Sequence, residues 1–562
     1  MKSIYSIFLF ILIFSGFSLT QEQNKTKYVS GYSPHYQTIS INQLKMIISN
    51  DGMGSYNPET GGAGLFWPGG KLADKPLATN DGLYWVGKIG DSVFAGASAY
   101  NTSYQPGKIL STGLADDPST QHYRVYKINK QWESYPYGSE REKLEKDFIE
   151  WPVEDGAPFY DSNNDGRFEK GIDEPLFYGD EQLWFVANDL FAAQTIYSTG
   201  TFPAGVEMQV LIYAFKYAGL FENTLIKVYR LINKGGRTLD SLYIGYFAEA
   251  VLGDPNDNFA GCDTILNLGY FYNANPVDTL YSQPPAVGYK LLQGPMVVGS
   301  DIDSAKFNDW WMKGFKNLDI NSFIASFPEY SFHGNGWLNN PLKGRVEIGA
   351  MFAGVELFLQ SKGHFWDGSK FNDPLTGEPT NFILCGDPVL QTGWYEGTGW
   401  PNGPLPGRRA LYMSAGPINF APGDTQEVAY AIHVAQGNDN IDAIDRLKRN
   451  AKNIQYFYDH YSPQKSNTNF KPPLPEYYHL SQNYPNPFNP VTVIDYSLPV
   501  KGQVSLRVYD ILGNEIKVIV NELQEAGDYR VQFNSDGLSS GVYFYSINSN
   551  EFLRTKKMMV IK

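Results

Sequence analysis

Two stretches decide the fold of this chain: Val206-Glu207-Met208-Gln209-Val210-Leu211-Ile212-Tyr213 and Thr224-Leu225-Ile226-Lys227-Val228-Tyr229-Arg230-Leu231. Each alternates or stays apolar for several residues, which is typical of the central strands of a β-sandwich. Working outward, residues 183–186 and 241–246 have the composition of two more strands, and Asn233-Lys234-Gly235-Gly236 has that of a tight turn. We therefore expect a mainly β protein with a β-sandwich-rich body and few helices.

Composition and periodicity divide the rest of the chain into regions. Residues 21–150 are rich in glycine and aromatic residues, with strands expected at 83–86 and 92–95 and a short helix around 140–143. Residues 151–460 form the central body, with further short strands expected within 346–358 and 426–435. The body is predicted to end in an amphipathic helix capped by Asp439 or Asn440, because apolar residues recur at spacings of three or four: Ile441, Ile444, Leu447, Ala451, Ile454 and Phe457.

The charge balance argues against one class of function. The chain has 45 Lys and Arg against 59 Asp and Glu, a net charge of −14, whereas nucleic-acid binding needs an excess of cations to contact phosphates. Aromatic residues reach 15% and charged residues only 19%, which suits short strands joined by tight turns. An acidic surface favours solubility and can also indicate calcium sites.

The N-terminus has the pattern of a secretory signal peptide over residues 1–20. Lys2 supplies the positive charge, residues 4–14 are mostly apolar, and Ser15, Gly16 and Ser18 are small residues suited to cleavage. The apolar run is too short to span a membrane, and no other segment is apolar enough to do so. We therefore expect a secreted protein with no transmembrane segment in the mature chain.

The chain has two cysteines, Cys262 and Cys385. An exported protein meets oxidising surroundings, so the pair permits one disulfide. Two buried free thiols are an equally open alternative, because the sequence does not bring the two residues together.

The C-terminal region has the pattern of a small separate sandwich. Residues 461–477 contain Pro472-Pro473-Leu474-Pro475 and are expected to form a stiff linker. From residue 478 to 562, about seven short strands with turns between them predict an antiparallel, immunoglobulin-like seven-stranded β-sandwich. Apolar residues there occupy every second position in four runs: Val504, Leu506 and Val508; Ile516, Val518 and Val520; Tyr529, Val531 and Phe533; Tyr543, Tyr545 and Ile547.

Five motifs follow one another through this region, and the last ends at the final residue. They are Asn483-Tyr484-Pro485-Asn486-Pro487-Phe488-Asn489-Pro490, Val508-Tyr509-Asp510-Ile511-Leu512-Gly513-Asn514-Glu515, Ala526-Gly527-Asp528-Tyr529, Leu538-Ser539-Ser540-Gly541-Val542-Tyr543-Phe544-Tyr545 and Lys556-Lys557-Met558-Met559-Val560-Ile561-Lys562. Residues 478–562 therefore resemble the type A sorting domain of the type IX secretion system.

The resemblance implies a cellular location for the protein. It implies export to the outside or the cell surface of a Gram-negative bacterium, with an outer-membrane translocon and a sorting protease as partners and surface lipopolysaccharide as a further one in some members. The sorting motif positions that it implies are Gly527, Tyr529, Gly541, Lys557 and Lys562. Body segments such as Ile232-Asn233-Lys234-Gly235 and Gly261-Cys262-Asp263-Thr264 resemble other large secreted proteins that carry this tail, a likeness that implies no particular activity.

The sharpest local signal for chemistry is Asp161-Ser162-Asn163-Asn164-Asp165-Gly166-Arg167-Phe168. Oxygen-bearing side chains at the first, third and fifth positions, followed by glycine, are what a calcium loop needs, and Arg167 would add its backbone carbonyl. Ile172 stands where an EF-hand has its twelfth-position carboxylate, so we expect a calcium loop closed by Asp173 or Glu174 instead. The alternative is an acidic turn without metal.

Two weaker signals remain. A second metal site could use Asp254, Asp257 and Asp263, although Asx residues also dominate ordinary loops. Tryptophans near glycines could offer flat faces to sugar rings, although most tryptophans lie in loops and cores for packing reasons. The four candidates for such a platform are Trp337, Trp366, Trp394 and Trp400.

No catalytic residue can be assigned from the sequence. It has no His-Glu-x-x-His zinc motif, no phosphate-binding Gly-Lys-Ser or Gly-Lys-Thr loop and no Gly-x-Ser-x-Gly elbow. The leading hypothesis is therefore a non-enzymatic exported protein with a structural or binding role and a structural calcium loop. The alternative is a secreted hydrolase acting on polysaccharide, or a carbohydrate-binding protein, because a pair of catalytic carboxylates is a spatial feature that the sequence does not display.

Overall fold

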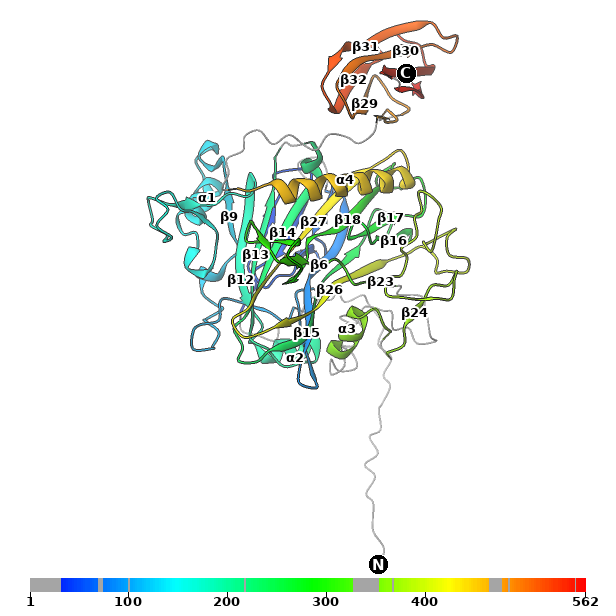
Figure 1. Cartoon of the computed structure of the whole chain (residues 1–562). Helices are drawn as coiled ribbons and strands as arrows, with labels where there is room; N and C mark the ends of the chain where they lie inside the picture. Colours follow the sequence, from blue (N-terminus) through cyan, green and yellow to red (C-terminus); the bar gives the residue numbers. More distant parts are fainter. Residues whose placement is uncertain are drawn as a thin grey trace, which may run out of the picture.

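The computed structural model describes residues 32–68, 74–99, 102–216, 219–326, 353–365, 368–463, 478–483, 486–550 and 552–561. Strands predominate in these residues, and the long strands of the body pair antiparallel. Figure 1 shows the sheets of the body crossed on one side by a single long helix. The expectation of a mainly β protein with a sandwich-rich body is confirmed.

The first large sheet of the body, sheet one, has eight strands in the order β1-β2-β5-β6-β15-β26-β23, with β7 paired to β6. Three of these strands are long, and β15 lies between β6 and β26. The bounds are β1 (Tyr36–Ile39), β2 (Lys45–Ser49), β5 (Leu65–Phe66), β6 (Pro76–Ile89), β7 (Ser92–Ala97), β15 (Leu239–Ala250), β23 (Ser322–Ser326) and β26 (Arg409–Phe420).

The second large sheet, sheet two, has nine strands in the order β16-β17-β18-β27-β14-β13-β12-β8, with β9 paired to β12. It contains the stretches at 206–213 and 224–231, which pair directly with each other as β13 and β14. The bounds are β8 (Gln105–Pro106), β9 (Tyr126–Asn129), β12 (Glu181–Asn188), β13 (Val206–Ala214), β14 (Thr224–Asn233), β16 (Asn258–Asp263), β17 (Leu268–Asn273), β18 (Pro285–Gln293) and β27 (Thr425–Gln436).

The two sheets face each other and enclose the main core. Tyr246 of β15 lies against Tyr430 of β27, with ring centroids 4.6 Å apart, so residues of both sheets belong to one buried cluster. Successive side chains of a strand point to opposite faces of its sheet. In β14, Tyr229 therefore points into this core, whereas Val228 and Arg230 point to the outer face of sheet two.

Strands from the two predicted regions, 21–150 and 151–460, share both sheets. In sheet one, β6 pairs with β15, and in sheet two, β8 and β9 both pair with β12. The glycine- and aromatic-rich N-terminal region is thus built into the same sandwich as the central body.

Four α-helices occur among the described residues: α1 (Ser139–Ile149), α2 (Ala192–Thr199), α3 (Ala353–Ser361) and α4 (Asn440–His460). The predicted C-terminal helix of the body is confirmed as α4, and Asp439 caps it by accepting hydrogen bonds from the backbone N–H groups of Ile441 and Asp442. Its apolar face packs on the outer face of sheet two, on β27 and β18. The strand expected within 346–358 is wrong for residues 353–358, because this apolar run forms α3, which packs on the strands of sheet one.

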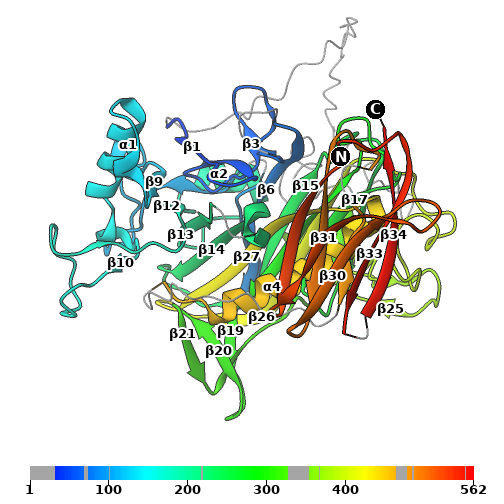
Figure 2. The same ribbon diagram turned by 90° about the horizontal axis from the view of Figure 1, so that it is seen from above.

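Small two-stranded sheets flank the sandwich: β3 (Tyr56–Asn57) with β4 (Gly62–Ala63), β10 (Phe159–Tyr160) with β11 (Glu174–Pro175), β19 (Met296–Val298) with β22 (Phe315–Asn317), β20 (Ser304–Phe307) with β21 (Trp310–Lys313), and β24 (Phe371–Asn372) with β25 (Pro379–Thr380). Figure 2 shows the β20–β21 hairpin projecting from the body. This hairpin contributes to the site described below.

The C-terminal residues form a three-stranded and a four-stranded sheet, in the orders β28-β29-β32 and β31-β30-β33-β34, which together give the seven strands expected. Ile516 and Val518 are 39% and 40% exposed, against the expectation of buried positions, because β31 is an edge strand whose register with β30 shifts between these residues and Val520. The bounds are β28 (His479–Leu480), β29 (Val491–Leu498), β30 (Gly502–Tyr509), β31 (Glu515–Gln524), β32 (Gly527–Asn534), β33 (Gly541–Ser549) and β34 (Phe552–Val560).

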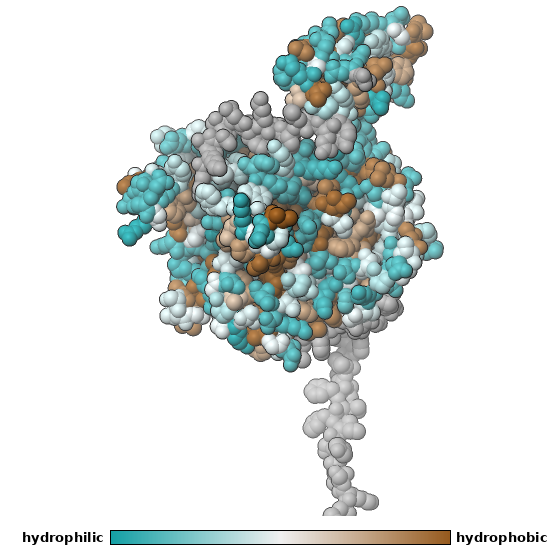
Figure 3. All heavy atoms as spheres, viewed as in Figure 1, coloured by the Kyte–Doolittle hydropathy of each residue, from teal (hydrophilic) through white to brown (hydrophobic). Residues whose placement is uncertain are grey.

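Some predictions fall outside the described residues, namely the signal peptide at 1–20, most of the linker at 461–477, Trp337, Trp366 and Lys562. Within the described part of the chain, no helix has both the length and the apolar character needed to cross a membrane. Figure 3 shows that hydrophobic side chains gather on the face of the body below α4, among mainly hydrophilic surroundings.

Candidate ligand-binding pocket

A pocket of about 400 Å³ opens on the outer face of sheet two. Its floor is made by two neighbouring rows of side chains that run across the strands. Gln209 of β13, Arg230 of β14 and Glu427 of β27 form a polar row, because Arg230 pairs with both of the others. Trp184, Leu211 and Val228 form the next row, which is apolar. The floor therefore offers hydrogen-bonding groups beside an apolar surface.

Three further elements form the walls of the pocket. Tyr458 and Tyr461 come from the C-terminal end of α4 and the residue that follows it, and residues 306–309 come from the β20–β21 hairpin. The third wall consists of residues 153–161, which connect a short 3₁₀ turn (Val153–Asp155) to β10 and include Asp161. Volumes of 300–1,000 Å³ are usual for small-molecule sites, so the pocket can hold a ligand of one or two sugar rings.

The tip of the hairpin places two polar side chains in the pocket. Asn308 and Asp309 have φ values of 49° and 65°, as a two-residue type I′ hairpin turn requires, and Asn and Asp tolerate this conformation. The Asp309 carboxylate accepts a hydrogen bond from the Tyr178 hydroxyl at 2.5 Å. The backbone N–H of Asn308 donates to Glu427 Oε1 at 3.1 Å, so the hairpin is tied directly to the floor.

The charged groups of the pocket compensate one another. Arg230 Nη2 lies 3.0 Å from Glu427 Oε2 and donates to Asn308 Oδ1 at 2.7 Å. Burial raises the pKa of Asp309, and Glu427 adds to this rise, whereas the Tyr178 hydroxyl and Lys306 oppose it. Burial lowers the pKa of Lys306 against the opposing effect of Asp309. Both shifts have the same first cause, which is burial of the charged group.

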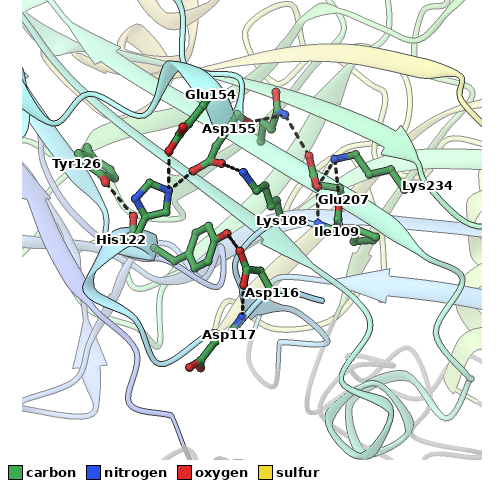
Figure 4. Close-up of polar contacts among 12 residues, drawn as sticks. Lys108, Ile109, Asp116, Asp117, His122, Tyr126, Glu154, Asp155, Glu207 and Lys234 are labelled. Carbon is green, nitrogen blue, oxygen red and sulfur yellow. Dashed lines mark hydrogen bonds and ion pairs between the residues drawn. The ribbon is translucent and has the colours of Figure 1, made fainter. Parts of the chain in front are cut away.

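A second polar network lies behind this wall (Figure 4). The His122 Nε2 atom lies 2.6 Å from Asp155 Oδ2, and the Lys108 ammonium donates to Asp155 Oδ1, also at 2.6 Å. Gln209 connects the network to the pocket, because its amide donates to the Asp155 carbonyl at 3.0 Å and to Glu207 Oε1 at 3.2 Å.

His122, Glu154 and Asp155 could in principle hold a metal, since their ligand atoms lie within 4.8 Å of one another. No other group of three such residues does so in the described part of the chain. The Lys108 ammonium, however, already neutralises the buried Asp155 carboxylate. The network is therefore better explained as a support that fixes the pocket wall.

The predicted calcium loop folds back on itself beside the pocket. Asp161 accepts hydrogen bonds from the backbone N–H groups of Asp165 and Gly166, and Asp165 accepts one from the N–H of Arg167. Asp173 is buried and accepts from the N–H groups of Ser162 and Glu169, so it closes the loop. These oxygen-bearing side chains are of the kind that calcium prefers, although no three of the loop's carboxylates lie within 4.8 Å of one another in the described structure.

The structure changes two details of the predicted loop. Glu174 lies in β11, exposed and paired with Tyr160, outside the loop's own hydrogen bonds. Glu169 joins the loop instead, because Asn163 Nδ2 donates to its Oε2 atom at 2.8 Å. Glu169 is the ninth residue of the loop, a position that often contributes a ligand, so its spacing was the signal available in the sequence.

The second acidic group is not brought together. Asp257 is buried and accepts hydrogen bonds from the side chains of Asn258 and Asn273. Asp263 lies at the opposite end of β16 and forms an ion pair with Lys448 at 3.2 Å. A six-residue strand is about 17 Å long, so Asp254 and Asp257 at one end cannot share a metal with Asp263 at the other.

The tryptophan platform also requires correction. Trp394 and Trp400 are 3% and 6% exposed and pack edge to face, with ring centroids 5.1 Å apart. Their faces are used for core packing and do not offer an exposed surface to sugars. The exposed tryptophans among the described residues are Trp310 and Trp311, at 60% and 51%, on the hairpin whose tip enters the pocket.

The main pocket residues leave only weak signals in the sequence. Arg230 and Glu427 are charged residues within largely apolar strands, which is a sign that those positions face a polar environment. Asn308-Asp309 between short aromatic runs is a hairpin signal. Neither signal shows that the two segments meet, because they are far apart in the sequence.

The comparisons with known proteins concern the C-terminal region. Residues 482–562 match the family described as the secretion system C-terminal sorting domain. The chain carries a sorting domain of the type IX secretion system. The resemblance stated from the motifs is confirmed, and the protein is secreted or displayed at the cell surface of a Gram-negative bacterium.

The sorting domain presents its motif residues on different strands. Gly527 and Gly541 begin β32 and β33, and the Tyr529 ring stacks on Tyr496 with centroids 5.2 Å apart. Lys557 lies in β34, where its carbonyl accepts a hydrogen bond from the Gln482 side chain. The domain implies interaction with the type IX secretion machinery.

The body is not assigned to a family by these comparisons. No curated protein matches the sequence. Among solved structures, a polysaccharide lyase matches with a TM-score of 0.16 and 9% identity, over 63% of this chain and 34% of the lyase. The chain thus spans about a third of that protein, and a likeness at this level carries no argument about activity.

Proposed function

We propose that this exported protein binds a saccharide in the pocket on the outer face of sheet two. The observation that carries the proposal is the paired floor, in which the polar row of Gln209, Arg230 and Glu427 lies beside the apolar row that begins at Trp184. Sugar rings have the same two-sided character, with hydroxyl groups around an apolar face. Aromatic side chains therefore commonly pack against them while amides and carboxylates bind the hydroxyls.

The charge balance of the pocket supports a ligand that is polar but not strongly charged. Arg230 is paired with Glu427, and Lys306 lies near Asp309 and donates to the carbonyl of Tyr458. An ionic ligand would have to displace one of these partners and leave a buried charge uncompensated. A hydroxyl-rich ligand can instead bind the remaining lone pairs and N–H groups without breaking the pairs.

We also propose that the loop from Asp161 to Asp173 binds calcium in a structural role. The loop is mostly exposed, and Asp161 belongs to both the loop and the pocket wall. Binding of the ion would therefore stiffen the wall next to the ligand. Excess chelator should lower the thermal midpoint of the protein, and Asp161→Ala with Asp165→Ala should remove this sensitivity. An unchanged midpoint on chelation would contradict the calcium proposal.

Hydrolysis of the bound saccharide is the second candidate function. Asp309 and Glu427 are two carboxylates that line one pocket, and burial raises the pKa of Asp309, as a general acid requires. The difference between the two candidates is turnover, because binding alone leaves the polymer intact.

The test is a screen of oligosaccharides and surface polymers against the mature full-length protein, scored for binding and for release of reducing ends. Asp309→Asn should weaken binding about tenfold or more, because it replaces an acceptor-only carboxylate bonded to Tyr178. The matched control is Asp301→Asn, an exposed carboxylate on the same segment outside the pocket, which should leave affinity unchanged. Equal affinity of the two variants would show that the saccharide does not bind in this pocket.

The sorting domain indicates where the protein would meet its ligand. A body displayed on or outside the cell meets polymers of the surface or the surroundings. A sorting protease that removes the domain would either release the body or link it to lipopolysaccharide, and fractionation of cells and medium distinguishes the two outcomes.

A further inference from the structure

The two cysteines of the chain, far apart in the sequence, meet at one side of the sandwich. Cys262 lies in β16, is 1% exposed and belongs to the main core cluster. Cys385 is partly buried and packs against the same cluster from the segment between β25 and β26. Both are free thiols in this structure.

Backbone hydrogen bonds hold this segment in place on both sides. The N–H of Cys262 donates to the carbonyl of Leu384 at 2.9 Å, which fixes residue 384 against the strand that carries Cys262. On its other side, the N–H of Ile383 donates to the carbonyl of Phe323 in β23, and the N–H of Phe323 donates to that of Asn381, both at 3.1 Å. Cys385 thus follows directly after residues whose backbone positions are fixed.

The two thiols interact with each other. Burial raises the pKa of the Cys262 thiol well above its ordinary value, and the Cys385 thiol, as its hydrogen-bond neighbour, raises it further. Because residue 384 accepts the backbone hydrogen bond of Cys262, the next residue, Cys385, lies beside β16, and its Sγ atom donates to the Ile383 carbonyl at 3.6 Å.

We propose that Cys262 and Cys385 form a disulfide in the exported protein. The reaction joins the two sulfur atoms and removes two protons and two electrons. The electrons pass by thiol–disulfide exchange to an oxidised dithiol catalyst of the export compartment, whose own disulfide is reduced to two thiols. Cys385 is the more accessible thiol and would form the mixed disulfide first, after which Cys262 displaces the catalyst.

The bond would close an open side of the sandwich. In the strand orders of the two sheets, β16 is the edge of sheet two and β23 is the edge of sheet one. The segment with Cys385 lies between these edges, and Figure 1 shows β16 and β23 on the same side of the body. A disulfide there would tie both sheets and the long connection between β23 and β26 together, outside the proposed pocket. It does not depend on the proposed function.

The decisive measurement is a thiol count on the mature full-length protein, purified from an exporting host without reductant. The protein is unfolded and alkylated with iodoacetamide, with and without prior reduction, and weighed by mass spectrometry. We expect no alkyl group without reduction, two after reduction, and a protease fragment pair that joins the peptides of Cys262 and Cys385. Two alkylated thiols without reduction, or a disulfide-linked dimer, would overturn the proposal.

A stability measurement provides a second, independent readout. Reductant should lower the thermal midpoint of the wild-type protein by about 5 °C or more, because closing a long loop stabilises the folded state. The Cys262→Ser/Cys385→Ser variant should melt at the lower temperature and show no effect of reductant. A wild-type midpoint that is the same with and without reductant would count against the bond even if the variant does not fold.

Discussion

At the scale of single residues, the most unusual feature is an ion pair in the centre of the main core. Lys227 of β14 and Asp81 of β6 come from opposite sheets, and their side chains are 0% exposed. Lys227 Nζ lies 2.6 Å from Asp81 Oδ1 and 2.9 Å from the Tyr246 hydroxyl, and Ser55 donates to Asp81 Oδ2 at 2.8 Å. Burial lowers the pKa of Lys227, and Asp81 opposes that shift.

This pair leads to a prediction about single and double variants. Lys227→Met should reduce the free energy of unfolding by about 3–5 kcal/mol, because it leaves the charge of the buried Asp81 carboxylate without a counter-ion. Asp81→Leu/Lys227→Met should recover much of this loss, since both polar groups are then removed. Thermal midpoints of the three proteins provide the measurement. A double variant as unstable as Lys227→Met would show that the pair itself, and not the orphaned charge, determines stability.

The surface offers a matched control for this experiment. Lys501 and Glu525 in the sorting domain form an ion pair whose side chains are 54% and 73% exposed. Lys501→Met should change stability by roughly 1 kcal/mol or less, because exposed pairs are screened by water and salt.

At the scale of elements, α4 covers part of the outer face of sheet two and so determines which side chains are buried there. His433 of β27 points toward the helix, close to Leu447 and Gly288, and its ring nitrogens have no hydrogen-bond partner among the described residues. Burial lowers the pKa of His433 to about 3, and the nearby Lys290 ammonium contributes in the same direction. The helix thus covers a histidine that stays neutral when the protein is folded.

The sign of the resulting pH dependence follows from the two states. The unfolded chain binds a proton at His433 near pH 6.5, whereas the folded protein does so only near pH 3, so stability falls as the pH drops below about 6.5. At pH 5 the loss from this residue is about 2 kcal/mol. Compared with His433→Leu, the wild-type protein should therefore lose more of its thermal midpoint between pH 7.5 and pH 5. A pH-independent difference between the two proteins would contradict this.

At the scale of the whole molecule, the fold of the body and the export of the protein depend on different parts of the chain. The sorting domain has its own core, formed by residues of both its sheets such as Tyr496 and Leu506. The body has a separate core between its two large sheets. We therefore expect that deletion of the sorting domain abolishes export and leaves the body folded.

A truncation should separate the two properties. Without residues 482–562, the protein should remain inside the cell envelope with its body folded, whereas the full-length protein should reach the cell surface or the medium. Immunoblots of cell fractions, with circular dichroism of the purified body, measure both effects. As a control, residues 478–562 fused to an unrelated periplasmic protein should direct its export. Surface display of the truncated protein would contradict an export role of the domain.

The sequence by itself determined the mainly β fold, the helix at the end of the body and the C-terminal sorting domain. Each depends on local patterns, namely strand alternation, the 3.6-residue period with its Asp439 cap, and motifs in a fixed order. Such patterns predict the folded structure because residues that are close in the sequence lie on the same helix or strand and share its environment. The same local approach was wrong for residues 353–358, where a short apolar run fits a strand and a buried helix equally well.

Only the tertiary structure showed where the pocket lies, that the described platform tryptophans are buried, and that the two cysteines lie near each other. Arg230, Asp309 and Glu427 come from three distant segments, and the strand order of sheet two with the turn of the β20–β21 hairpin brings them together. Cys262 and the segment that carries Cys385 are brought together in the same way, at the edges of two sheets. The physical reason is that burial and contact between distant residues depend on how strands are ordered in space, and local periodicity carries no information about that order.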